Sequence, residues 1–129
     1  MTSLETPIRV LLVEDNDVYR ESLVFLLRRV QGLDVVGAVA VGARAASVCL
    51  EARADVVVVD FRLPDVDGAE VAADLRSRCP AAAVVFLSAS AGEDEYDAAS
   101  SAGAELVRKD EGVAALVGAV RAAAGRRRE

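Results

Sequence analysis

Residues 55–68 read Asp-Val-Val-Val-Val-Asp-Phe-Arg-Leu-Pro-Asp-Val-Asp-Gly, and this stretch decides the fold. Four valines, residues 56–59, end at Asp60, and a turn built on Pro64 and Gly68 follows at once. A continuous run of β-branched residues is typical of a strand buried on both faces, as in the middle of a parallel sheet. Open α/β folds bind ligands at the carboxyl ends of such strands. Taken alone, however, Asp60 is better explained as a residue that caps the following turn.

The composition indicates one globular domain. The chain has 129 residues, of which 53% are hydrophobic, and its net charge is -6. This acidity argues against a nucleic-acid-binding surface. No apolar run approaches the roughly 20 residues that a membrane span needs, and residues 1–9 carry no signal peptide. We therefore expect a cytoplasmic protein with a single domain over 1–129, in which 125–129 is a tail or the start of a linker.

The cysteines and the absence of histidine limit the chemistry. Cys49 and Cys79 are the only cysteines, and the sequence has no Cys-x-x-Cys spacing and no histidine. A zinc site is therefore not expected, and we expect two reduced thiols in the core. Any phosphoryl chemistry would have to rest on carboxylates, a hydroxyl, a lysine and a metal.

Apolar segments with strand and helix periodicity alternate along the whole chain. The first helix is expected to begin at a cap on Asn16 or Asp17 and to end at Gly32. This alternation predicts an α/β fold, a doubly wound parallel sheet with right-handed crossovers and helices on both faces. The expected strands are 8–13, 33–41, 54–60, 83–88 and 105–108, and the later helices are about 43–52, 68–78, 94–102 and 112–124.

The expected helices differ in the strength of their apolar stripes. Helix 94–102 has a weak stripe, Tyr96 and Ala99, and many small residues, so it should be the loosest element. The first helix has a stronger stripe, which consists of Tyr19, Leu23, Leu26, Leu27 and Val30.

Polar residues follow four of the predicted strands. Glu14 and Asp15 come after the first, Asp60 ends the third, Ser88 ends the fourth and Lys109 follows the fifth. In a parallel sheet these ends share one edge. Carboxylates crowded together repel by several kcal/mol at moderate dielectric, so the pattern favours a cation there. Oxygen ligands in a partly hydrated site suit Mg²⁺, or Mn²⁺.

Each of these residues also has a structural explanation. Glu14 and Asp15 could be helix-capping acids, Ser88 a strand-end hydroxyl, and Lys109 a solvated surface lysine. Their occurrence in order, each at its own strand end, is what favours a common site.

The same residues carry a resemblance to the receiver domain of two-component response regulators, over nearly the whole chain. The matching motifs are Val-Glu-Asp-Asn at 13–16, Asp-Phe-Arg-Leu-Pro-x-x-x-Gly at 60–68, Leu-Ser-Ala at 87–89, and Lys109. Asp110 after the lysine is common in the NarL/LuxR-type subfamily. The resemblance implies a flavodoxin-like (βα)5 fold with strand order 2-1-3-4-5.

The resemblance also implies a metal site. Asp15 and Asp60 would bind Mg²⁺ (or Mn²⁺) directly, together with the backbone carbonyl of Arg62. Glu14 would act through water.

The implied function is phosphorelay signalling, in which Asp60 accepts a phosphoryl group from a sensor histidine kinase. Ser88 would hydrogen-bond the phosphoryl group and Lys109 would pair with it. The chain would be no enzyme beyond its own phosphoryl transfer and dephosphorylation. Receivers often carry Tyr or Phe where this chain has Leu106. The switched surface, for a partner or a homodimer, would consist of helix 94–102, strand 105–108 and helix 112–124.

Two other functions stay open. A haloacid-dehalogenase-like phosphatase would need a second Asp two residues after Asp60, where this chain has Arg62. A receiver-like interaction module would keep the fold but never be phosphorylated. If the receiver belongs to a longer regulator, transcription would be regulated through a further DNA-binding domain, without direct nucleic-acid binding by this one.

Overall fold

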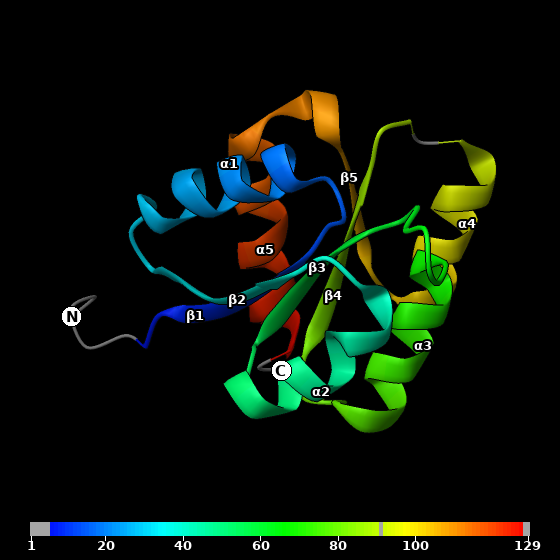
Figure 1. Ribbon diagram of the computed structural model, residues 1–129, viewed down its shortest axis with the longest axis horizontal. Coiled ribbons are helices and arrows are strands. Elements are labelled where there is room, and N and C mark those ends of the chain that lie inside the picture. Colours follow the sequence, from blue (N-terminus) through cyan, green and yellow to red (C-terminus); the bar gives the residue numbers. More distant parts are fainter. Residues whose placement is uncertain (1–5, 91, 128–129) are drawn as a thin grey trace.

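The computed structural model describes residues 6–90 and 92–127 (Figure 1). Within these residues, one five-stranded parallel sheet has the order β2-β1-β3-β4-β5, which confirms the predicted flavodoxin-like topology. The strands are β1 Ile8–Val13, β2 Leu33–Val39, β3 Val56–Asp60, β4 Ala83–Ser88 and β5 Glu105–Arg108. The helices are α1 Asp17–Arg28, α2 Ala45–Ala52, α3 Gly68–Arg78, α4 Glu93–Ala102 and α5 Val113–Arg127, with short 3₁₀ turns η2 Gly42–Arg44 and η3 Lys109–Glu111.

Strand β3 is the centre of the molecule, and all five of its residues are buried. Because side chains alternate across a strand, Val56 and Val58 pack on the face covered by α1 and α5. Val57 and Val59 pack on the opposite face, under α2, α3 and α4. The expectation of a strand buried on both faces is therefore confirmed.

The helix and strand ends are less well predicted on the β1–β2 side of the molecule. The first helix ends at Arg28, not at Gly32, because the N–H groups of Arg29 and Val30 already bond back to the carbonyls of Leu26 and Leu27. Gly32 instead adopts a φ of 90° in the turn before β2, and its carbonyl accepts the N–H of Ile8 at 2.8 Å. Residue 16, an asparagine, provides the N-cap.

Other ends shift by one to three residues. Arg53 is left-handed with φ 57°, and the N–H of Ala54 bonds to the carbonyl of Cys49, so Ala54 closes α2 and does not begin β3. The second strand ends at Val39 instead of 41, and the second helix starts as the 3₁₀ turn η2. The last helix begins after Gly112, whose φ is 91°, and runs to 127.

One residue of the apolar stripe predicted for the first helix is exposed to solvent. Leu23 and Leu27 are buried under α1 as expected, but Leu26 is 40% exposed on the outer side of that helix. No helix in the described ranges is both long and apolar enough to cross a membrane.

Gly68 provides a test of how tightly the turn after β3 is packed. A Cβ at Gly68 would lie 2.7 Å from the Cα of Phe61 and 2.9 Å from its carbonyl oxygen. Backbone cannot move aside as a side chain can, so Gly68→Ala should lower the free energy of unfolding by about 2 kcal/mol in urea titrations.

The matched control is Gly118→Ala in α5, where a Cβ would meet nothing within 4 Å. This variant should be neutral or stabilised by about 0.5–1 kcal/mol, because alanine favours a helix interior over glycine. Equal stability of the two variants would contradict the close approach at Gly68.

Candidate functional site

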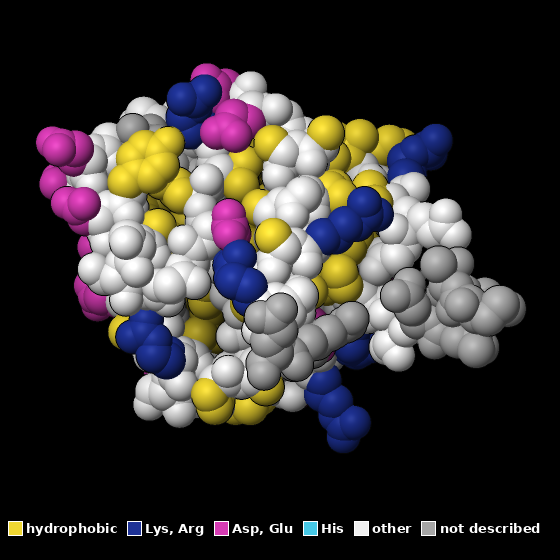
Figure 2. Space-filling view, turned by 180° about the vertical axis from the view of Figure 1, so that it is seen from behind, with side chains coloured by type: hydrophobic (Ala, Val, Ile, Leu, Met, Phe, Trp, Pro, Cys, Tyr) yellow, Lys and Arg dark blue, Asp and Glu magenta, His cyan; other side chains and the backbone are white. Residues whose placement is uncertain are grey.

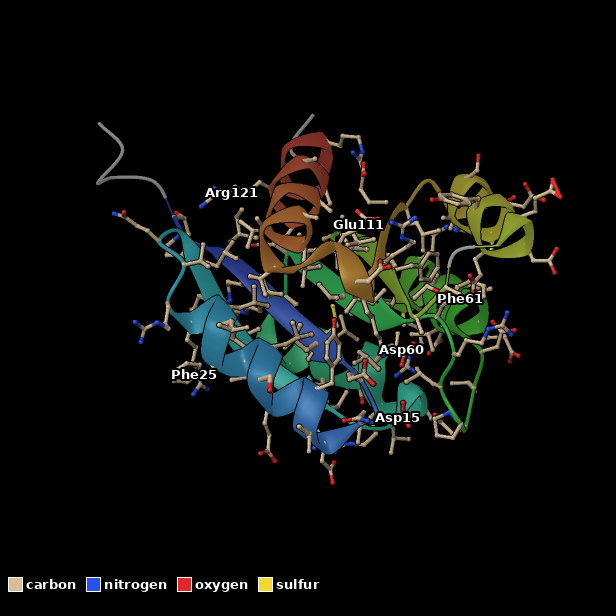
Figure 3. All side chains as sticks on the ribbon, turned by 90° about the horizontal axis from the view of Figure 1, so that it is seen from above. Asp15, Phe25, Asp60, Phe61, Glu111 and Arg121 are labelled. Atoms are coloured by element: carbon tan, nitrogen blue, oxygen red, sulfur yellow. The ribbon has the colours of Figure 1, made fainter. Side chains whose placement is uncertain are left out.

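Three carboxylates meet where β1 and β3 end side by side. The register pairs Val13 with Val59, so Glu14 and Asp60 follow on neighbouring strands. One oxygen each of Glu14, Asp15 and Asp60 lies within 4.8 Å of the others. Glu14 is 1% exposed and Asp60 5%, whereas Asp15 is open to solvent. Figure 3 shows Asp15 and Asp60 together at this edge.

Lys109 supplies the positive charge that faces two of these carboxylates. Its Nζ lies 2.8 Å from Glu14 Oε1 and donates to Asp60 Oδ2 at 3.3 Å. Burial acts to lower the pKa of Lys109, but its hydrogen bond to Glu14 and the charge of Asp60 outweigh it, so the pKa is raised. The side chain therefore remains an ammonium ion.

An aromatic ring from α1 covers this ammonium. Lys109 Nζ lies 4.6 Å from the centroid of the Tyr19 ring, a cation–π contact. Burial raises the pKa of Tyr19, so the phenol stays neutral at physiological pH. The helical spacing identified Tyr19 as a core residue, and its contact with Lys109 depends on how α1 sits against η3.

Each oxygen of the Glu14 carboxylate has its own partner. Its Oε2 accepts the N–H of Asn16 at 3.0 Å, which fixes the carboxylate. Its Oε1 is buried and forms an ion pair with the Lys109 ammonium at 2.8 Å. Together with Asp15 and Asp60, this oxygen gives a donor set of hard oxygens, which fits Mg²⁺ or Mn²⁺.

Ser88 is buried at the end of β4, but its hydroxyl is engaged locally. Its Oγ donates to the carbonyl of Ser90. Among the described residues, no hydrogen bond joins this hydroxyl to Asp60 or Lys109. The structure therefore places Ser88 at the same sheet edge without bringing its hydroxyl into the charged cluster.

Arg62 connects the site to α4. Its backbone N–H donates to Asp60 Oδ1 at 3.1 Å. Its guanidinium Nε lies 3.3 Å from Glu95 Oε2. Glu95 is 2% exposed, and its other oxygen accepts the N–H of Gly92 at 3.0 Å, which caps α4. A single buried carboxylate thus joins the loop after β3 to the first turn of α4.

Glu95 was not found from the sequence. It lies in the run Glu-Asp-Glu at 93–95, and acids in a first helical turn are expected to be exposed and to favour the helix dipole. The sequence did offer one signal for its role: Glu95 is the third residue of the helix, where a glutamate can form a capping box.

The loop between β3 and α3 is held at two further points. Asp65 accepts the N–H groups of Gly42 and Ala43, each at 3.0 Å. Desolvation acts to raise the pKa of Asp65, but the N–H groups of Ala43 and Gly42 prevail and lower the pKa. Asp67 caps α3 through the N–H of Ala69 at 2.8 Å. These bonds fix the backbone on which Asp60 and Arg62 lie.

Removing the charge of Lys109 should destabilise the protein. Lys109→Met keeps the length of the side chain but leaves Glu14 and Asp60 without their ammonium. Breaking a buried ion pair costs several kcal/mol, and partial exposure of the lysine reduces this cost. We expect a loss of about 2 kcal/mol in the free energy of unfolding, measured by urea titration without divalent cations.

Lys109→Arg is the control, because it retains the positive charge and should recover at least half of that loss. If the Met variant were as stable as the parent protein, the ammonium would not be balancing the two carboxylates.

The geometry agrees with comparisons to known proteins. The family model described as "Response regulator receiver domain" matches residues 10–121. A relative in Mycobacterium tuberculosis, the DNA-binding transcriptional activator DevR/DosR, is 39% identical over 80% of this chain and 48% of its own length. A Myxococcus xanthus protein-glutamate methylesterase/protein-glutamine glutaminase is 38% identical over 93% of this chain and 38% of its own length. The chain thus spans about half or less of these relatives.

Solved structures show the same fold. The signal receiver domain of NarL from Mycobacterium tuberculosis superposes with a TM-score of 0.81 at 30% identity, covering 91% of this chain and 98% of that one. A LuxR-family two-component response regulator from Aurantimonas sp. gives a TM-score of 0.86 at 30% identity, covering 93% and 86%.

Proposed function

The chain belongs to the response regulator receiver domain family, and from that premise we propose that Asp60 accepts a phosphoryl group from a sensor histidine kinase. The observation that carries the proposal is the ammonium of Lys109, which lies between Glu14 and Asp60. A nearly buried carboxylate that lies next to a fixed cation is suited to attack on phosphorus. The receiver would occupy 1–129 as one domain, whose last helix, α5, extends to Arg127.

A divalent cation completes the proposed site. Asp15, Asp60 and the backbone carbonyl of Arg62 would hold Mg²⁺ or Mn²⁺, and Glu14 would act through water. When bound, the cation would supply positive charge beside the oxygens of the transferred group. The convergence of the three carboxylates within 4.8 Å of one another, two of them nearly buried, supports this assignment.

The protein groups have separate tasks in the transfer. A carboxylate oxygen of Asp60 forms the new O–P bond while the P–N bond to the kinase histidine breaks. The Lys109 ammonium contacts the phosphoryl oxygens, because charge-assisted hydrogen bonds are the strong ones. The Ser88 hydroxyl would leave the carbonyl of Ser90 and donate to the phosphoryl group.

The readout would pass to α4 through two routes. One is Ser88, whose movement changes the loop before α4. The other is the ion pair between Arg62 and Glu95, which lies two residues from Asp60. The proposed switched surface is α4, β5 and α5, and it would form a homodimer or bind a partner. Figure 2 shows acidic side chains gathered along the edge that α4 forms, and Glu93, Asp94 and Asp97 are exposed there.

The relatives suggest which process this receiver would control. DevR/DosR is a DNA-binding transcriptional activator of which this chain spans about half. We propose that the receiver likewise controls transcription through a further domain. The methylesterase relatives share the receiver region too, but the described site has the composition of a phosphoacceptor, and we propose no enzymatic activity beyond self-catalysed transfer and dephosphorylation.

Incubation with acetyl phosphate and Mg²⁺, followed by intact-mass measurement, tests the phosphoacceptor. The parent protein should gain the mass of one phosphoryl group, and Asp60→Asn should gain none. Omitting Mg²⁺ should reduce the adduct sharply, as should Asp15→Asn. Asp74→Asn is the matched control, since this half-exposed carboxylate pairs with Arg78 on the same helix, α3, and its loss should leave the adduct unchanged.

Two results would indicate a function other than phosphoryl acceptance. Steady release of phosphate with no adduct would indicate a phosphatase. A chain that takes no phosphoryl group from acetyl phosphate or from a panel of histidine kinases would be an interaction module that is never phosphorylated.

The connection from Arg62 to Glu95 can be tested by hydrogen exchange. Glu95→Gln keeps an oxygen to cap Gly92 but loses the charge, and Arg62→Ala removes the partner. Each should speed amide exchange in the first turn of α4 several-fold, and the double variant should add little, since coupled residues are not additive. Their coupling should be about 0.5–1 kcal/mol, the value of a half-exposed pair. Arg76→Ala, an exposed arginine on α3, is the control, and additive effects would show that the pair is not coupled.

A further inference from the structure

The two cysteines lie against each other in the core. Cys49 in α2 is 0% exposed, and Cys79, which caps α3, is 6% exposed. Their sulfur atoms are 2.7 Å apart, and both are free thiols. A disulfide bond measures about 2.05 Å, so little movement separates the two thiols from a bond. The expectation of two core thiols is met, but the sequence did not indicate that they touch.

We infer that Cys49 and Cys79 form an intramolecular disulfide under peroxide stress, and that this bond clamps α2 to α3. The backbone on each side is fixed. The carbonyl of Cys49 accepts the N–H of Ala54 at 3.1 Å. Cys79 donates its N–H to Leu75 at 2.6 Å and accepts the N–H of Ala82 at 3.0 Å. Because both anchors are parts of the folded core, the sulfur atoms stay together instead of meeting by chance.

The chemistry needs a two-electron oxidant of the hydroperoxide class. One thiol is oxidised to a sulfenic acid as the peroxide O–O bond breaks and one water leaves. The second thiol then attacks the sulfenic sulfur, the S–S bond forms and a second water leaves. Overall, two thiols and one hydrogen peroxide give one disulfide and two waters.

Burial determines how fast this occurs. Desolvation, together with the hydrogen bond to Cys79, raises the pKa of Cys49 to about 12. The reactive thiolate of Cys49 is therefore rare at neutral pH, which slows its attack in either step. Cys79 is 6% exposed and Cys49 is 0% exposed, so Cys79 is the thiol that peroxide reaches more easily. The reaction should be slow, and the product should persist once it forms.

The bond would close a loop that contains the whole phosphoacceptor region. Residues 49–79 include β3, Asp60, the following turn and α3. The sulfur atoms lie near the starts of β3 and β4, at the opposite edge of the sheet from the carboxylates. Figure 1 shows α2 and α3 on the same face of the sheet, and the two cysteines lie toward the C-terminal ends of these helices, which lead into β3 and β4. The cross-link should therefore stiffen the domain without entering the charged site.

The test compares native protein before and after hydrogen peroxide treatment at neutral pH. Denaturation, thiol alkylation and intact-mass measurement should show loss of two hydrogen atoms, no alkylation, and no gain of oxygen. The oxidised monomer should melt on the order of 10 °C higher, since closing a loop of this length constrains the unfolded chain. A dithiol reductant should reverse both changes.

Cys49→Ala and Cys79→Ala are the controls, and neither should gain thermal stability with peroxide. Two alkylatable thiols after treatment, stepwise addition of oxygen to either sulfur, or a disulfide only between two chains would each overturn the inference. The measurement on the unsubstituted protein stands even if a variant folds poorly, and it is independent of whether Asp60 takes a phosphoryl group.

Discussion

The contact between the Lys109 ammonium and the carboxylates of Glu14 and Asp60 is what the site depends on. Two carboxylates less than 5 Å apart repel by about 3 kcal/mol at an effective dielectric of 20, and here both are nearly buried. Lys109 is the chain's only lysine, and every other basic residue is an arginine. An ammonium is a compact charge on a flexible stem, whereas a guanidinium is a wide planar fork, so lysine fits the space between two carboxylates that face it from different strands.

Sheet order explains why these residues meet. Glu14 and Asp60 follow adjacent strands, but Lys109 comes from β5, which is separated from β3 by β4. The lysine side chain must therefore pass the end of β4. That strand ends in Ser88, a small residue, and a small side chain there leaves room for a long one. Tyr19 covers the lysine from α1, so the ammonium is held by three elements besides its own.

Much of this arrangement could be predicted because it depends on local pattern. The valines before Asp60 identify a doubly buried strand, and Gly68–Arg78, Ala83–Ser88 and Glu105–Arg108 have the ends expected for them. Predictions from the sequence were wrong where a residue type is common in two different structural settings. Gly32 looked like a helix terminator, but its positive φ serves the turn into β2. Leu26 matched the helical period, yet the path of α1 leaves it exposed.

Other features depend on tertiary contact alone. Glu95 reads as one exposed acid among three, and only the packing of α4 against the loop after β3 buries it and pairs it with Arg62. Cys49 and Cys79 meet because α2 and α3 share a face of the sheet. The two contacts act on different helices at different edges: Arg62 connects the carboxyl edge to α4, whereas the thiols connect α2 to α3 near the amino edge. A covalent clamp at the second place would raise the free energy of unfolding without involving the side chains of Arg62 and Glu95. The proposed clamp and the proposed switch would therefore act through contacts that share no residue, and they are connected by the packing of α3 against α4.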